Sequence, residues 1–137
     1  MEKPEVIVTM RTFPIRVGNA FDKGGNQIGT SGPVYDDQRE VTWEELGVPL
    51  ERTTVTKKVR RVFTWSNINL EKVIITLNPD KIFLNFLQYL KDDNPSFESP
   101  MAKLFISSIE AKISELSSNA VVKWVGVGPR ISNVLER

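Results

Sequence analysis

A run of basic and hydroxyl side chains at residues 53–61 is the part of the sequence whose residue types best suit chemistry. It joins threonine hydroxyls to lysines and arginines and contains no acidic residue. Arginine forks bind carboxylate or phosphate through two parallel hydrogen bonds, and lysine adds a point charge. Residues 53–61 therefore predict an anion-binding loop. A second interpretation, a solvated basic segment or one paired with the acidic segment at 36–45, fits the composition equally well and stays open.

The sequence contains neither histidine nor cysteine. It therefore lacks the commonest acid–base group near neutral pH and the thiolate nucleophile, so chemistry would need carboxylates, lysines or a second polypeptide. It also has no glycine-rich phosphate loop of the form Gly-x-x-x-x-Gly-Lys-Ser/Thr. We accordingly assign no catalytic residue and no metal ligand to this chain.

Composition indicates an ordinary globular protein. The 137 residues are 40% hydrophobic and 26% charged, which is close to the average of globular domains and enough for one core. A formal charge of +1 provides no general attraction to nucleic acid or membranes. No apolar run approaches the roughly 18 to 20 residues of a membrane span, and the first residues do not resemble a secretory leader. We expect one domain over 1–137, in the cytoplasm, without nucleic-acid or membrane partners.

Strands and helices alternate along the sequence. We predict strands at 6–13, 81–87 and 121–125, and a helix over 67–77 between Ser66 as N-cap and a stop at Asn78-Pro79. Thr42 and Glu45 form a capping box for one short helical turn. A last helix begins at Ser99-Pro100 and ends near 118, with an apolar stripe of Met101, Leu104, Phe105, Ile109, Ile113 and Leu116.

This alternation predicts an α/β fold with a partial, mostly parallel sheet and crossover helices. Crossovers between parallel strands are right-handed, and ligands bind beyond the carboxyl ends of such strands. The apolar run at 81–87 is typical of a strand buried on both faces. Three strands with two helices would leave the sheet incompletely covered. Glycine-rich residues 19–32 predict a loop, within a long excursion at about 19–62.

Three segments in order and spacing resemble the adenylosuccinate synthetase family. They are residues 10–18 (Met-Arg-Thr-Phe-Pro-Ile-Arg-Val-Gly), residues 31–33 (Ser-Gly-Pro), and residues 54–56 leading into Arg60-Arg61. The similarity continues to the closing residues 126–130 and covers nearly the whole chain. It corresponds to the C-terminal part of the family, and so implies the C-terminal portion of the adenylosuccinate synthetase fold.

The resemblance implies a ligase that joins aspartate to a purine nucleoside monophosphate with hydrolysis of a nucleoside triphosphate, with Mg²⁺ bridging the anionic groups of the complete enzyme. Carried over position by position, it implies substrate-binding residues near the ribose and aspartate: Arg16, Val17, Gly18, Thr56, Lys58 and Arg60. It also implies nucleotide-binding residues: Arg60, Phe86, Gln88, Gly126, Val127 and Gly128.

Two departures from the family pattern change these expectations. Lys57 replaces a glycine of the loop, and Lys58 and Val59 replace arginines, so a bidentate grip on aspartate is weakened. Gln88 stands where the family has a carboxylate that pairs with guanine, so we expect poor guanine selectivity and acceptance of adenine. GTP and ATP stay open as donors. The departures resemble a phage-type branch that includes 2-aminoadenylosuccinate synthetase, which leaves IMP and dGMP open as substrates.

The family carries its phosphate loop, catalytic aspartate and catalytic histidine in its N-terminal part. The resemblance therefore implies a chain that is inactive without a complementary N-terminal polypeptide, and it leaves a homo-oligomer open. The alternative is a non-catalytic remnant of the fold that binds a nucleotide or a protein.

Overall fold

The computed structural model describes residues 2–137, which divide into two compact units. We call residues 2–12 with Ser66–Arg137 the sheet unit, and Phe13–Trp65 the inserted unit. The excursion expected at about 19–62 lies within the inserted unit. None of the helices within residues 2–137 is long and apolar enough to cross a bilayer.

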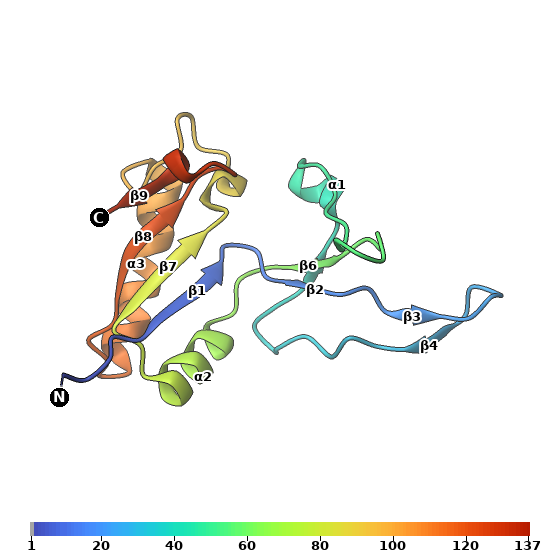
Figure 1. The fold of residues 1–137 in the computed structure, drawn as a ribbon, viewed down its shortest axis with the longest axis horizontal. Coiled ribbons are helices and arrows are strands. Elements are labelled where there is room, and N and C mark those ends of the chain that lie inside the picture. Colours follow the sequence, from blue (N-terminus) through green and yellow to red (C-terminus); the bar gives the residue numbers. More distant parts are fainter. Residues whose placement is uncertain (1) are drawn as a thin grey trace. The chain divides into compact units, whose positions relative to one another are not determined.

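The sheet unit is built on four strands in the order β1-β7-β8-β9. Strands β1 (Ile7–Arg11), β7 (Lys81–Asn85) and β8 (Val121–Gly126) are parallel, as their arrows in Figure 1 show. The predicted α/β fold with a mostly parallel sheet is confirmed. Strand β9 (Val134–Glu136), which pairs antiparallel with β8, is not among the predicted strands.

Two crossover helices join the parallel strands. Helix α2 (Asn67–Leu77) has the predicted bounds: Ser66 Oγ accepts from Asn69 N at 3.0 Å, and Asn78 ends the helix with a φ of 43°. Helix α3 (Pro100–Glu115) comes after the 3₁₀ turn η1 (Leu87–Leu90) in the chain. A second 3₁₀ turn, η2 (Ile131–Asn133), comes after β8. Element α3 thus begins at the predicted proline and ends slightly early.

The core of the sheet unit lies on one face of the sheet. Ile82 and Leu84 of β7 are fully buried, whereas Lys81 and Phe83 are only half-buried, so the prediction of a strand buried on both faces is wrong. Helix α3 contacts both α2 and strand β8. The predicted stripe of α3 is also shifted, because Met101 and Leu104 are exposed and the buried residues are Ala102, Ile106, Ile109 and Ile113.

The inserted unit contains a small antiparallel sheet in the order β2-β6-β5, formed by Ile15–Arg16, Arg61–Phe63 and Glu40–Val41. Its buried residues are Val41, Trp43, Val62 and Phe63. Helix α1 (Trp43–Leu46) has the predicted Thr42–Glu45 capping box. Residues 19–32 are not only loop, because β3 (Ala20–Phe21) and β4 (Gln27–Gly29) pair as a hairpin closed by hydrogen bonds to Asp22.

Candidate functional site

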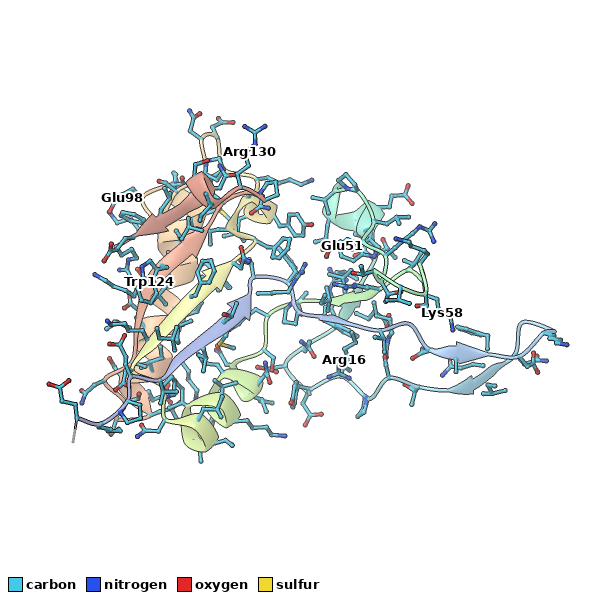
Figure 2. All side chains as sticks on the ribbon, in the orientation of Figure 1. Arg16, Glu51, Lys58, Glu98, Trp124 and Arg130 are labelled. Atoms are coloured by element: carbon cyan, nitrogen blue, oxygen red, sulfur yellow. The ribbon has the colours of Figure 1, made fainter. Side chains whose placement is uncertain are left out.

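A cavity of about 370 Å³ lies in the sheet unit where β7 and β8 end. It occupies the place where ligands bind in open parallel sheets, beyond the carboxyl ends of the strands. Its lining includes three of the predicted nucleotide-binding residues, Phe86, Gln88 and Gly128. The remaining lining residues are Phe83, Asn85, Pro129, Arg130, Ile131 and Val134. Of these, Arg130 is exposed (Figure 2).

Phe86 is held in a left-handed backbone conformation, with a φ of 61°. This is unusual for a bulky residue and persists only where the surroundings hold it in place. The Arg11 guanidinium lies 3.6 Å from the centre of the Phe86 ring, and the Tyr89 ring centre is 5.2 Å away. Phe86 therefore gives the cavity an aromatic wall suited to stacking against a planar ring, while Arg11, which is not a lining residue, lies against the Phe86 ring.

Gln88 lies in η1, two residues after Phe86. Its Oε1 is buried and has no hydrogen-bond partner within residues 2–137. A buried polar atom without a partner costs about 1–3 kcal/mol, which a polar ligand would recover. Because the last torsion of glutamine is soft, rotation can present either the oxygen or the nitrogen of the amide.

Two asparagines explain why glycine occupies positions 126 and 128. A Cβ at Gly126 would stand 2.1 Å from Asn85 Oδ1, and a Cβ at Gly128 would stand 2.6 Å from Asn133 Oδ1. Between them, Val127 N donates to Asn133 O at 3.0 Å. Gly126 and Val127 thus hold the wall together, whereas Gly128 lines the cavity. Asn85 is not among the predicted site residues, although its position at the end of a parallel strand was an available signal.

The anion-binding loop of the sequence analysis is an ordered turn in the inserted unit. Arg52 and Val59 form an isolated antiparallel bridge, and Thr53 N donates to Lys58 O at 2.8 Å. Lys57 has a φ of 57°, so the backbone conformation suited to glycine is kept although lysine stands there. Thr56 Oγ1 lies 2.6 Å from Thr53 Oγ1.

A cavity of about 380 Å³ in the inserted unit brings together Gly18 and Lys58, two predicted substrate-binding residues. Gly18 packs closely, because a Cβ there would lie 3.0 Å from Val59 O. A neighbouring cavity of about 330 Å³ is lined by both Gly18 and Arg60. Figure 2 marks Lys58, which forms no ion pair within residues 2–137 and is exposed.

The other predicted substrate residues line neither of these two cavities. Val17 is 61% exposed, and Thr56 bonds within its own turn. The Arg16 guanidinium donates to Pro33 O and lies 5.0 Å from the centre of the Phe63 ring. The binding roles of these residues stay predictions.

Arg61, at the end of the basic run, is a structural residue. It forms two hydrogen bonds with Glu40 at 2.9 and 3.0 Å, and donates to Asn19 Oδ1, Ser31 Oγ and Gly32 O. The hydrogen bonds with Glu40 raise the pKa of Arg61 above its ordinary value. Pairing with the acidic segment therefore accounts for Arg61, while Lys57 and Lys58 are left without ion pairs in the described chain.

No group of three histidine, cysteine, aspartate or glutamate side chains within residues 2–137 could hold a metal ion. No protein-family model matches the chain. Curated relatives do match it along almost its whole length. The N6-succino-2-amino-2'-deoxyadenylate synthase of Vibrio phage phiVC8 is 44% identical over 131 residues, which are 95% of this chain and 33% of that enzyme.

The synthase of the same name from Acinetobacter phage SH-Ab 15497 is 39% identical over 132 residues, or 96% of this chain and 32% of the relative. A solved structure of cyanophage S-2L succinoaminodeoxyadenylate synthetase (PurZ), bound to dGMP and to dATP as an energy donor, matches with a TM-score of 0.69 and 36% identity. It covers 96% of this chain and 33% of the S-2L chain.

The chain thus spans about a third of the length of the relatives it matches. These matches support the resemblance to an adenylosuccinate synthetase-like fold. They also agree with the phage-type branch, because the matched relatives are phage enzymes. By sequence and by fold, this chain is similar to one third of the phage N6-succino-2-amino-2'-deoxyadenylate synthases.

Proposed function

We propose that this chain supplies the nucleotide-binding third of a ligase that joins aspartate to a purine nucleoside monophosphate, dGMP or IMP, with hydrolysis of a nucleoside triphosphate. The observation that carries the proposal is the cavity at the ends of β7 and β8. It combines the Phe86 ring with the unpaired amide oxygen of Gln88. The relatives matched along this chain are synthases of that class, and the S-2L enzyme binds dGMP and dATP.

The cavity would hold the purine base of the triphosphate, stacked on Phe86 with its Watson–Crick edge on Gln88. For adenine, the amide oxygen accepts from the N6 amino group while the amide nitrogen donates to N1. Rotated by half a turn, the same amide donates to O6 of guanine and accepts from N1–H. A carboxylate at this position would serve only guanine, since it cannot donate to N1 of adenine. Gln88 therefore makes ATP and dATP acceptable donors.

In the inserted unit, the cavity shared by Gly18 and Lys58 would bind the monophosphate and aspartate. Lys58 contributes a cation that is not neutralised by an ion pair in the described chain. We propose that Mg²⁺ arrives on the phosphates of the triphosphate, because Mg²⁺ keeps waters and is usually held by substrate phosphates with one or two carboxylates. Turnover would also need the parts of a synthase to which this chain has no match, which we propose lie on a complementary polypeptide or region.

Calorimetric titration with ATP, dATP and GTP tests the base site, with Gln88→Asp as the informative variant. We expect all three to bind the unmodified chain, and Gln88→Asp to weaken ATP by about tenfold or more while sparing GTP, because a carboxylate faces N1 of adenine but accepts from N1–H and N2–H of guanine. Gln27→Asp makes the same chemical change in the β3–β4 hairpin and should leave both affinities unchanged. No heat with any purine triphosphate would contradict the proposal.

Turnover is tested by mixing the chain with a polypeptide that covers the rest of the phiVC8 synthase, then adding ATP, aspartate and dGMP or IMP. We expect phosphate release that depends on both aspartate and the monophosphate. Nucleotide binding without such release would favour the second candidate, a non-catalytic nucleotide-binding remnant.

A further inference from the structure

We call the cavity at the ends of β7 and β8 the base cavity. The side chain of Asn85 is held there by a hydrogen bond to its amide oxygen, and its amide nitrogen makes no hydrogen bond within residues 2–137. Asn85 is the last residue of β7 and lines the cavity beside Phe86 and Gln88. Its backbone oxygen accepts from both Thr12 N at 3.0 Å and Thr12 Oγ1 at 2.9 Å. Thr12 itself is only 1% exposed. The strand end that carries Asn85 is therefore held by two hydrogen bonds from a buried residue.

The orientation of the amide follows from its neighbours. Asn85 Oδ1 accepts from Phe86 N at 2.9 Å. A backbone N–H can only donate, so the atom that it meets must be the oxygen, and the two donor hydrogens lie on Nδ2. The side chain also lies over Gly126, where no Cβ opposes it. Its Nδ2 makes no hydrogen bond within residues 2–137, so a directed donor is left for a ligand.

We infer that Asn85 Nδ2 donates to N7 of the purine base, as a specificity-determining contact of the triphosphate site; this inference rests on the proposed function. A purine has two polar edges, and Gln88 occupies the Watson–Crick edge in that proposal. N7 is an acceptor in both adenine and guanine, so a neutral donor fixed beside it selects purines without choosing between them. Asn85 thus recognises N7 of the ring system, while Gln88 contacts the Watson–Crick edge.

ATP and 7-deaza-ATP separate this contact from all others. The analogue replaces N7 by C–H and keeps the Watson–Crick edge, the ribose and the phosphates. We expect the unmodified chain to bind 7-deaza-ATP about tenfold more weakly than ATP, the usual effect of losing one buried hydrogen bond. In Asn85→Ala, both nucleotides should bind with the same, weaker affinity.

Asn85→Asp provides an outcome of opposite sign and guards against misfolding of the alanine variant. Its carboxylate can still accept from Phe86 N, but it presents an acceptor to N7, so this variant should bind 7-deaza-ATP more tightly than ATP. Asn119→Ala removes the same atoms from an exposed position just before β8 and should keep the tenfold discrimination.

Equal binding of ATP and 7-deaza-ATP by the unmodified chain would overturn the inference while leaving the proposed function in place. Discrimination that persists in Asn85→Ala would do the same. Failure of ATP itself to bind would overturn both.

Discussion

At the scale of single residues, the base cavity depends on the close packing of Asn85 against Gly126. Asn85 lies where a side chain at position 126 would stand, so the glycine and the asparagine require each other. The packing of Asn85 is the physical reason for glycine at position 126.

Gly126→Ala should therefore destabilise the sheet unit by about 1–3 kcal/mol, as expected when a methyl group is forced into a filled space. It should also weaken ATP binding, because the Asn85 amide is displaced. Urea denaturation followed by tryptophan fluorescence measures the stability. Trp124 lies in β8 beside the change.

The double variant Asn85→Ala/Gly126→Ala is the matching control. Removing the asparagine side chain makes room for the new methyl group, so Gly126→Ala should cost far less stability in the Asn85→Ala background. Equal costs in both backgrounds would show that the two residues do not compete for the same space.

At the scale of elements, helix α3 is capped from outside its own sequence neighbourhood. Ser99 occupies the N-cap position but makes no side-chain cap bond. Instead, Asp92 Oδ1 and Oδ2 accept from Met101 N at 3.0 Å and Ala102 N at 2.9 Å. A carboxylate on the first amides of a helix satisfies two donors and complements the helix dipole. Asp92 thereby ties the loop after η1 to the start of α3.

Asp92→Asn should lower the free energy of unfolding by about 0.5–2 kcal/mol, the range of lost helix caps. Part of the effect should disappear at high salt, since the charge interaction with the helix end is screened. Asp93→Asn makes the same change at the neighbouring exposed position and should have little effect. Equal losses from both variants would indicate a general charge effect instead of a cap.

At the scale of the whole molecule, each compact unit has its own buried residues and its own candidate site. The sheet unit buries residues of β1, β7, β8, α2 and α3, and the inserted unit buries Val41, Trp43, Val62 and Phe63. Arg61 connects distant parts of the inserted unit, because its partners Asn19 and Ser31 lie 42 and 30 residues away in the sequence. Its side chain is 13% exposed.

Arg61→Lys should destabilise the inserted unit by about 1–3 kcal/mol, because lysine cannot reproduce the fork that reaches Glu40 and the loop at 31–32 together. Hydrogen-exchange mass spectrometry should show faster exchange in residues 13–65 and little change in β7 and β8. Arg39→Lys, at an exposed ion pair with Glu45, is the control and should alter exchange only slightly. Uniform acceleration over both units would contradict separate stabilisation.

The sequence by itself determined the features that depend on neighbouring residues. The bounds of α2, the Thr42–Glu45 capping box and the proline start of α3 were predicted because caps and helical periodicity act over a few residues. The parallel strands followed from the alternation of elements. Phe86, Gln88 and Gly128 were predicted together by resemblance, and the structure brings them into one cavity.

Only the tertiary structure decided which faces and side chains are used. It restricted the core to one face of β7, paired β9 with β8, and assigned Arg61 to the inserted sheet. It also laid Asn85 over Gly126 and Asp92 on α3. These outcomes depend on contacts between residues far apart in the chain, for which local pattern carries no signal. The physical reason is that burial and hydrogen-bond partners are set by the packing of whole elements.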